Sequence, residues 1–596
     1  MTEHGGPATL CEAFQATVAR YPQQVALRTP GGAVTLTWQQ YAGRIRGVAA
    51  GLAGLGVGHG DTVALMMANR PEFHLVDTAA FHLGAVPFSI YNTFAPEQIR
   101  QVLSNAGSRV MVCEEQFAAR LLAVTDGTAA GHVVCVDGKP DGTLTLGELV
   151  AGGDRAFGFE ARWQAVQPAD VLTLIYTSGT TGPPKGVEIT HAQMLAELAA
   201  TSTLMPAGPG DRAISYLPMA HVAERFASHY TAMFTGMQAT ALADVKDLPG
   251  ALREVRPTFF GAVPRVWEKL KAGIEAKVTC EPDQARRVAI QQALETAREY
   301  VAAAEAGPVP AGLTAAYRRA GEQVLSKIRS AAGLDQMRVA ICGAAPIAPE
   351  ILKFMLGLGI EINEVWGMSE VSCIATANEP GAIRIGTVGK AIPGVALKLA
   401  GDGELLVRGQ TVMKGYRGEP GQTADAVDPE GWLHTGDIAT IDSDGYVRIV
   451  DRKKDLIINA AGKNMSPANI ETAVLAASAL IGQVVAIGDR RPYVVALIVL
   501  DSDAAATFAA HIGATDTSAA ALATHPAIYA AVDAAVKAGN SKLSRPEQIK
   551  CFSILPAFWE PGGEEITPTM KLKRRPIAAK YAEVIDSMYA RAGQPA

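Results

Sequence analysis

The chain has 596 residues, a formal net charge of -6 and 48% hydrophobic residues. It therefore exceeds the size of one hydrophobic core, and it lacks the basic field that general nucleic-acid binding needs. Its seven cysteines form no Cys-x-x-Cys pair, which argues against a zinc site or a disulfide framework and favours a reducing, cytoplasmic compartment. The polar start does not resemble a signal peptide, and no apolar run of about 18 residues predicts a transmembrane helix. Peripheral membrane contact is left open.

The first part of the chain alternates helical and strand patterns. Amphipathic patterns predict helices over residues 38–55 and 72–83, and short apolar runs predict strands over residues 62–66, 110–113 and 258–263. Such alternation is typical of α/β proteins with mostly parallel sheets. We therefore predict a large α/β body.

An anion-binding pattern follows the apolar strand pattern at residues 171–175. Residues 176–187 read YTSGTTGPPKGV. Glycines let backbone N–H groups converge on phosphate oxygens, hydroxyls add donors, and Lys185 adds charge. The segment is neither a Walker loop, whose lysine stands between glycine and Ser/Thr, nor a G-x-G-x-x-G fingerprint. A polar surface loop is the alternative to a phosphate site formed by Thr177, Ser178, Gly179, Thr180, Thr181, Gly182 and Lys185.

The composition then changes three times along the chain. Residues 283–332 are rich in Ala, Glu, Gln and Arg, and we predict a helical insertion there. A coiled-coil partner surface is less well supported, because sustained heptads are absent. Beyond residue 385, short strands between glycines predict a small β-rich lobe. The charged break at residues 451–455 precedes renewed α/β alternation, so we place a domain boundary there.

Six segments, in order, resemble those of the adenylate-forming (AMP-binding) superfamily, and most closely its long-chain fatty acyl-CoA synthetases. They are YTSGTTGPPKGV from Tyr176, YLPMAHVAER from Tyr216, VWGMSE from Val365, GWLHTGD from Gly431, DRKKD from Asp451 and TPTMKLKR from Thr567. Their order and spacing are more specific than any single motif. The resemblance implies an AMP- and acyl-binding domain over residues 1–451, a hinge over 452–454 and a small, mobile α+β domain over 455–596.

The resemblance also implies an activity. Such an enzyme uses ATP and Mg²⁺ to convert a medium- or long-chain fatty acid into acyl-AMP and pyrophosphate, and then transfers the acyl group to CoA with release of AMP. Transfer to a carrier-protein thiol, a non-fatty acid as substrate, and a catalytically silent scaffold are the alternatives. The implied partners are small molecules rather than nucleic acid, and formation of a homodimer is left open.

By the same resemblance, the phosphate segment would hold the β- and γ-phosphates of ATP. Trp366 stands where the family usually has a tyrosine stacked on adenine, which keeps the aromatic face and changes the polar atom. Asp437 would accept hydrogen bonds from both ribose hydroxyls, and Arg452 would contact the ribose and phosphate side. The remaining nucleotide-binding candidates lie in two short turns and are Gly343, Ala344, Ala345, Gly367, Met368 and Ser369.

Three residues are candidates for the chemistry. Lys571 aligns with the adenylation lysine of the family. A cation at that place, between the carboxylate and the α-phosphate, would lower the repulsion between the two anions. Lys573, two residues further on, is the alternative. Glu370 matches the Mg²⁺ ligand, and one protein carboxylate is a common arrangement for that ion. His221 is expected near the substrate carboxylate, with a structural histidine as the alternative.

The last candidates concern the acyl group and CoA. Trp267 resembles a gating tryptophan of the acyl site and is equally well explained as a core residue. Lys454 lies at the implied hinge, about which domain alternation would withdraw the adenylation lysine. Gly462 would then approach the pantetheine of CoA, although a loop without function is also consistent with its segment.

Overall fold

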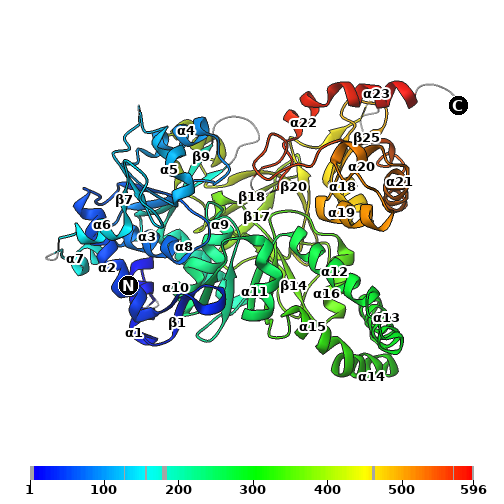
Figure 1. Ribbon diagram of the computed structural model, residues 1–596, viewed down its shortest axis with the longest axis horizontal. Coiled ribbons are helices and arrows are strands. Elements are labelled where there is room, and N and C mark those ends of the chain that lie inside the picture. The colour runs from blue at the N-terminus through cyan, green and yellow to red at the C-terminus, as the bar shows by residue number, and fades with distance from the viewer. Residues whose placement is uncertain are drawn as a thin grey trace.

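The computed structural model describes residues 6–126, 128–154, 157–177, 184–459, 464–567 and 570–592. Figure 1 shows a large body of sheets and helices, with a smaller unit at the upper right that contains the C-terminal helices. We call the described residues from 464 onward the C-terminal unit. The mixture of parallel and antiparallel sheets with helices confirms the predicted α/β class.

The largest sheet has eight strands, namely β3 Thr62–Met66, β4 Val86–Ser89, β5 Val110–Cys113, β6 His132–Cys135, β7 Leu144–Thr145, β8 Val171–Thr177, β9 Lys185–Thr190 and β19 Gly415–Tyr416. They lie in the order β19-β9-β8-β4-β3-β5-β6-β7. The centre is parallel, whereas β8 and β9 form an antiparallel pair. Every residue of β3 is buried, as expected for a parallel strand covered on both faces.

Two further sheets belong to the large body. One contains β12 Phe259–Ala262, β13 Val339–Cys342, β14 Ile362–Trp366, β15 Thr376–Ala377 and β16 Lys390–Ala391, and its first three strands are parallel. The other contains β1 Val25–Arg28, β2 Thr35–Thr37, β10 Arg212–Ser215 and β11 Gln238–Ala241. Ligands of α/β sheets bind beyond the carboxyl ends of parallel strands. The turns after β13 and β14 lie at such an edge.

The predicted helices form with small shifts at their ends. α2 runs over Trp38–Gly54 and begins with a capping box between Thr37 and Gln40. α3 runs over Pro71–His82. Other helices of the body are α1 Leu10–Arg20, α4 Pro96–Ala106, α5 Glu115–Leu122, α8 His191–Leu204, α11 Leu248–Val255, α12 Pro264–Thr279 and α16 Pro349–Gly357.

The helical prediction for residues 283–332 is also confirmed. This region forms α13 Gln284–Ala306, α14 Ala311–Ala320, a π-helical turn at Gly321–Leu325 and α15 Ser326–Ala332. Figure 1 shows α13 and α14 projecting from the lower right of the body. A stack of Tyr300 on Tyr317, with ring centroids 4.1 Å apart, joins the two helices.

The β-rich lobe is a four-stranded sheet of β17 Val395–Leu399, β18 Glu404–Gly409, β20 Leu433–Ile441 and β21 Val447–Arg452. The C-terminal unit has its own sheet of β24 Ile481–Ile487, β25 Val494–Leu500 and β26 Ile549–Ile554, with the helices α18 Pro467–Leu475, α19 Ser502–His511, α21 Pro526–Asn540, α22 Arg574–Lys580 and α23 Ala582–Ala592. A separate apolar cluster supports this sheet. Among the described residues, no helix combines the length and hydrophobicity needed to span a bilayer.

Buried neutral histidines make the stability of the large body depend on pH. Burial lowers the pKa of His82 and of His191 to about 3 each. The unfolded chain takes up these protons below about pH 6.5, whereas the folded chain does not, so acid favours unfolding by up to about 1.4 kcal/mol per pH unit for each histidine. Burial raises the pKa of Glu224 and of Glu364 to about 7 each and also raises that of Glu197, and these three carboxyls act in the opposite direction. They are outnumbered, because burial also lowers the pKa of His74, His221 and His229.

We therefore expect the urea midpoint of the large body to fall between about pH 6.5 and about pH 5. His191→Phe should flatten this dependence, because it removes one of the titrating groups. Unfolding followed by tryptophan fluorescence across this range measures the effect. A midpoint that rises steadily with acid would contradict it.

Candidate functional site

Tyr416 links the end of the phosphate segment to Glu370. The Tyr416 hydroxyl donates to Oε1 of Glu370 at 2.9 Å, and the Lys185 ammonium lies 4.9 Å from the centre of the Tyr416 ring. β19 carries Tyr416 beside β9, whose first residue is Lys185. Two predicted site residues thus come together through a tyrosine that the sequence analysis missed. Its only sequence signal, an aromatic residue in a two-residue strand, is too common to identify a site.

The remaining residues of the phosphate prediction divide into two groups. Thr177 ends β8 and is paired in register with Lys185. Ser178, Gly179, Thr180, Thr181 and Gly182 lie outside the described residues, so their part in a phosphate site stays a prediction.

Glu370 has the surroundings of a single-carboxylate cation site. It lies in the short 3-10 turn Ser369–Val371 and is 8% exposed. Burial and the Glu370 carboxylate raise the pKa of Tyr416, so this hydroxyl stays protonated and donates. The second carboxylate oxygen makes no hydrogen bond to the described residues, and within them no cluster of three or more His, Cys, Asp or Glu is found. This donor set fits Mg²⁺, which takes one or two protein carboxylates and completes its shell with phosphate and water.

A second carboxylate, Asp437 in β20, is held from two sides. The indole N–H of Trp366 donates to Oδ2 at 2.9 Å, and Nε of Arg452 lies 2.7 Å from Oδ1. Burial raises the pKa of Asp437, while Arg452 and the Trp366 hydrogen bond oppose that rise. Each carboxylate oxygen can accept a further donor. The predicted Asp437 and Arg452 are therefore neighbours, and the polar atom that distinguishes Trp366 from a tyrosine orients the carboxylate.

The turns at residues 343–345 and 367–369 are closely packed, so they have little room for larger side chains. Gly367 stands where a Cβ would lie 1.8 Å from the Cys373 carbonyl oxygen, and a Cβ on Gly343 would lie 2.9 Å from the Val365 side chain. Ala344 adopts φ +72, an uncommon value for a residue other than glycine. Ala345, Met368 and Ser369 complete the turns. Backbone approach, rather than side-chain chemistry, is what these segments offer to a ligand.

Lys571 reaches this cluster from the C-terminal unit. The pKa of its ammonium is lowered by desolvation first and by repulsion from Arg452 second, while Asp437 and Glu370 act in the opposite direction. The residue keeps surface open to water, so protein surrounds the ammonium without enclosing the whole side chain. Lys573 instead donates to the Gly563 carbonyl at 2.7 Å. Of the two candidate lysines, Lys571 is the one directed at the cluster.

His221 lies next to Lys571 and also caps a helix turn. Its Nδ1 accepts the Ala223 N–H at 3.1 Å, which places the proton of the neutral ring on Nε2. Burial, together with repulsion from Lys571, lowers its pKa to about 4. The ring is therefore neutral at pH 7. His221 caps the turn Val222–Glu224, which supports the structural interpretation, and a place near the substrate carboxylate stays a prediction.

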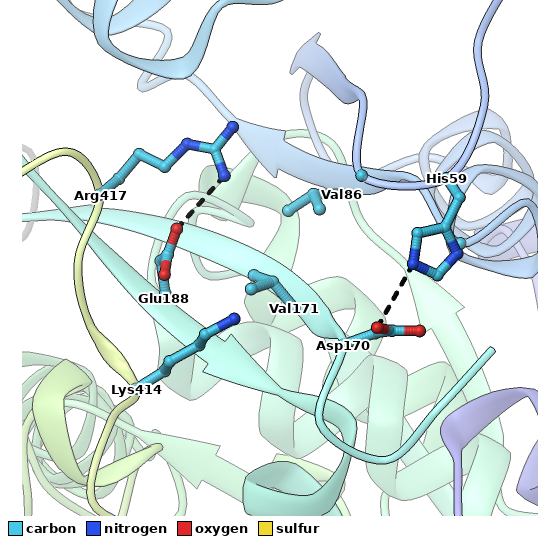
Figure 2. A pocket seen from close by; sticks show the side chains of 9 residues that line it. His59, Val86, Asp170, Val171, Glu188, Lys414 and Arg417 are labelled. Carbon is cyan, nitrogen blue, oxygen red and sulfur yellow. Dashed lines mark hydrogen bonds and ion pairs between the residues drawn. The ribbon is translucent and has the colours of Figure 1, made fainter.

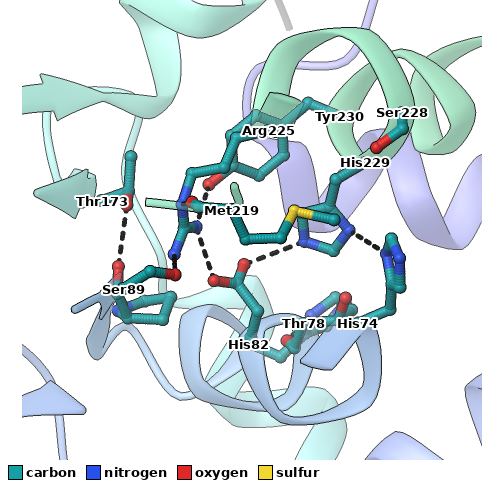
Figure 3. A network of polar contacts seen from close by, with 12 residues as sticks. His74, Thr78, His82, Ser89, Thr173, Met219, Arg225, Ser228, His229 and Tyr230 are labelled. Atoms are coloured by element: carbon teal, nitrogen blue, oxygen red, sulfur yellow. Dashed lines mark hydrogen bonds and ion pairs between the residues drawn. The ribbon is translucent and has the colours of Figure 1, made fainter. Parts of the chain in front are cut away.

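Buried Arg225 anchors the loop that carries His221, and the sequence analysis missed it (Figure 3). Its Nε donates to the Met219 carbonyl at 3.0 Å, its Nη1 lies 2.6 Å from Asp77, and its Nη2 donates to Ser89 at 3.0 Å. Arg225 and Asp77 are fully buried. Arg225 is the last residue of the motif YLPMAHVAER, and its position among apolar residues could have indicated a buried ion pair. A buried arginine needs an acidic partner.

Asp77 is shared with a pair of buried histidines. Nε2 of His229 lies 2.9 Å from Asp77, and Nδ1 of His229 lies 2.8 Å from Nδ1 of His74. Burial lowers the pKa of both rings, so both are neutral. His229 then donates to Asp77 and accepts from His74. This leaves Nε2 of His74 as a buried acceptor without a partner in the described chain.

Trp267 is a core residue in this structure. It is fully buried, and its ring meets Phe260 edge-on at 5.5 Å. Its indole N–H has no partner among the described residues. Further along α12, Leu270 and Ile274 line a cavity of about 590 Å³ that α11, α13 and α15 close on the other sides. A gating role for Trp267 stays a prediction.

Two further candidates belong to the C-terminal half. Lys454 is the second residue after β21, and burial lowers the pKa of its ammonium. Gly462 lies outside the described residues. The roles proposed for both in domain alternation and CoA binding stay predictions.

A second cavity, of about 190 Å³, lies beside β9 (Figure 2). Four of its polar groups form two pairs, Asp170 with His59 at 3.3 Å and Glu188 with Arg417 at 3.2 Å, and Lys414 also lines the cavity. Both carboxylates are thus engaged by neighbouring side chains. The cluster of Glu370, Asp437, Arg452 and Lys571 is the better candidate site.

Comparison with known proteins identifies the family of the chain. The family model described as AMP-binding enzyme matches residues 14–417, and that described as AMP-binding enzyme C-terminal domain matches residues 454–593. A Mycobacterium tuberculosis protein named fatty-acid–CoA ligase fadD11 is 55% identical over 76% of this chain and 79% of its own. The long-chain-fatty-acid–CoA ligase FadD15 of Mycobacterium bovis is 37% identical over 93% of this chain and 92% of its own. The long-chain-fatty-acid–CoA ligase ACSBG2 of Gallus gallus is 31% identical over 99% of this chain and 82% of its own.

Solved structures match the fold over nearly the whole chain. The anthranilate CoA ligase AuaEII in complex with anthranoyl-AMP superimposes with a TM-score of 0.73 at 16% identity, covering 97% of this chain and 99% of that one. ATP-bound MatB from Rhodopseudomonas palustris superimposes with a TM-score of 0.69 at 21% identity, covering 96% and 99%. At these identities the likeness concerns the fold alone.

Proposed function

Because the chain belongs to the AMP-binding enzyme family, we propose that it is an AMP-forming long-chain fatty acid–CoA ligase. In the first step a fatty acid carboxylate attacks the α-phosphorus of ATP, and acyl-AMP and pyrophosphate form. In the second step the CoA thiol attacks the acyl carbon, and acyl-CoA and AMP leave. The observation that carries the proposal is the convergence of Lys571 with Glu370, Asp437 and Arg452 across the two parts of the chain.

The first step brings two anions together, and the cluster supplies the opposite charge. The Lys571 ammonium would stand between the carboxylate and the α-phosphate and stabilise the charge of the transition state. Mg²⁺, held by Glu370, would neutralise charge on the phosphates. Lys185 would stabilise the departing pyrophosphate. Neutral His221 would lie beside the carboxylate without adding a second cation next to Lys571.

The nucleoside end would be held by the second carboxylate. Asp437 would accept the ribose hydroxyls, because Trp366 and Arg452 fix its orientation while each oxygen can still accept. The face of Trp366 and the turns at residues 343–345 and 367–369 would surround the adenine. Lys454 would act as the hinge that moves the C-terminal unit before the thioester step, and Gly462 would approach CoA.

Product analysis with purified protein tests the proposal. We expect AMP, pyrophosphate and a CoA thioester in equal amounts when palmitate, ATP, Mg²⁺ and CoA are all present. Adenylate formation without consumption of CoA would favour transfer to a carrier-protein thiol. Absence of acid-dependent AMP formation with any carboxylic acid would favour a silent scaffold.

We propose further that the cavity on α12 receives the distal part of the acyl chain. Its volume lies within the range of small-molecule sites. Leu270 and Ile274 follow Trp267 at helical spacing, so one face of α12 leads from that ring to the cavity. Apolar side chains line much of the cavity, with charged ones such as Arg253, Lys277 and Lys327 among them, and the apolar part suits a hydrocarbon chain.

Ile274→Trp should therefore shift the preference toward shorter acids. We expect kcat/KM to fall about tenfold for an acid of about sixteen carbons and less than about twofold for one of about eight, since the added ring fills only the distal space. A competition assay with the two acids measures the ratio. Val288→Trp, on an exposed position of α13, is the matched control and should leave it unchanged. An equal loss for both acids would contradict the proposed location.

A further inference from the structure

An ion pair joins the large body to the C-terminal unit beside the candidate site. Arg265 lies in the first turn of α12, and its Nη2 contacts the carboxylate of Asp501 at the start of α19. The side chains are 25% and 14% exposed. Arg265 is part of α12 and Asp501 stands between β25 and α19, so regular structure fixes both backbones. The contact is therefore geometrically defined rather than a chance meeting of two long surface side chains.

Asp501 is prepared for this contact by its own helix. Its Oδ1 accepts the Ala504 N–H at 3.0 Å as the N-cap of α19, which leaves Oδ2 to face Arg265. Burial disfavours the charged carboxylate, but the Ala504 hydrogen bond and then Arg265 keep its pKa below the usual value. Asp501 is thus ionised at neutral pH. Arg265 also contacts Glu268 at 3.1 Å, which fixes its guanidinium.

Two other ion pairs cross the same boundary but are far more exposed. Lys269 lies 3.2 Å from Asp503, and their side chains are 56% and 82% exposed. Lys542 lies 2.5 Å from Glu350, and their side chains are 47% and 49% exposed. Exposed pairs contribute little, because water and salt screen them. Asp451 of the large body also accepts hydrogen bonds from Ser466 and from the Ala468 N–H, but that contact lies next to the chain connection between the two parts. Of the three ion pairs across the boundary, Arg265–Asp501 is the least exposed.

The position of Asp501 determines that of Lys571, because both belong to one rigid unit. Asp501 follows β25, which pairs with β24. The Glu471 carboxylate accepts a backbone N–H of β24 at 2.8 Å and holds Arg574 by two contacts of 2.6 and 2.7 Å. Arg574 is three residues from Lys571. A shift of α19 against α12 is therefore transmitted to the lysine.

A second contact shows how closely the unit is docked. Gly562, nine residues before Lys571, packs against Thr93 of the large body, where a Cβ on the glycine would lie 2.3 Å from the threonine side chain. The neighbouring Gly563 carbonyl accepts the Lys573 ammonium. This loop reports on the docked arrangement independently of any chemistry.

We propose that Arg265 and Asp501 are positioning residues for the adenylation step, which hold the C-terminal unit so that Lys571 faces Glu370 and Asp437. The inference rests on the proposed ligase function. Neither residue contacts the reacting atoms in this arrangement, and their effect is exerted through the placement of Lys571. Loss of the pair slows acyl-AMP formation and leaves the thioester step unchanged, because the second step does not use Lys571.

A double-mutant cycle with Arg265→Gln and Asp501→Asn tests this. Asparagine keeps the helix cap, so the second variant removes the charge without removing the capping oxygen. We expect each variant to lower fatty acid-dependent ATP–pyrophosphate exchange about fivefold, and the double variant to be no slower than either single one. Thioester formation from supplied acyl-AMP and CoA should stay at the wild-type rate. Lys542→Gln, which removes one of the exposed ion pairs across the same boundary, is the matched control and should retain wild-type exchange.

Amide hydrogen exchange supplies a readout that does not depend on activity. In Arg265→Gln and Asp501→Asn, exchange at residues 91–94 and 560–563 should become faster, and in Lys542→Gln it should not. Unchanged protection, additive losses in the double variant, or equal slowing of both half-reactions would each overturn the positioning role. If wild-type protein shows no exchange of pyrophosphate with any acid, the proposed function fails, and the hydrogen-exchange comparison still decides the docking role.

Discussion

Lys571→Ala is expected to lower fatty acid-dependent ATP–pyrophosphate exchange by about a hundredfold to a thousandfold, the loss typical of removing one preorganised charge partner of a transition state. No other lysine replaces it, because the neighbouring Lys573 donates to a backbone carbonyl. Arg452 forms an ion pair with Asp437, so the carboxylate already neutralises part of its charge. Thioester formation from supplied acyl-AMP should continue at close to the wild-type rate.

The two half-reactions measured separately distinguish this role from a structural one. Lys573→Ala is the matched control, since it removes the same charge two residues away, and it should change exchange by less than about threefold. Lys571→Arg should recover little activity, because a planar guanidinium does not reproduce a compact ammonium. Full exchange in Lys571→Ala would show that the lysine had been misassigned.

Asp77→Ala is expected to lower the free energy of unfolding of the large body by about 3–5 kcal/mol, because it leaves Arg225 buried without its counter-charge. His229 loses its acceptor in the same variant. The effect should reach the candidate site, since Arg225 also fixes the Met219 carbonyl two residues before His221. We therefore expect slower exchange even at temperatures where the variant is folded.

Urea unfolding of the large body, followed by tryptophan fluorescence, measures the loss. Asp137→Ala is the control, because its pair with Arg70 is partly exposed and should contribute no more than about 1 kcal/mol. Asp77→Asn should be destabilised less than Asp77→Ala, since it keeps hydrogen-bonding atoms. Similar stabilities for Asp77→Ala and Asp137→Ala would mean that the buried network contributes little.

Local patterns predicted many elements closely. The strand at residues 62–66 and the strand at residues 110–113 form with the expected ends, because both are short apolar runs between helices. The helices began or ended within a residue of their predicted bounds where a cap or a proline marks the end, as at Thr37 and Pro71. Local patterns did not predict which strands pair with each other. Nothing local to residues 415–416 shows that they would join β9 from more than two hundred residues away.

The sequence by itself determined the family and the α/β class, because these depend on motifs of adjacent residues and on local periodicity, and it nominated the charged candidates of the site. Tertiary structure decided which charges meet. It placed Tyr416 on Glu370, joined the Trp366 indole to Asp437, and paired Arg225 with Asp77. It also gave Lys571 and Lys573, which stand two residues apart, different neighbours: Arg452, Asp437 and Glu370 act on Lys571, and Lys573 donates to the Gly563 carbonyl. The reason is physical: burial and partner distance fix the energy of a charge, and both are properties of the folded chain.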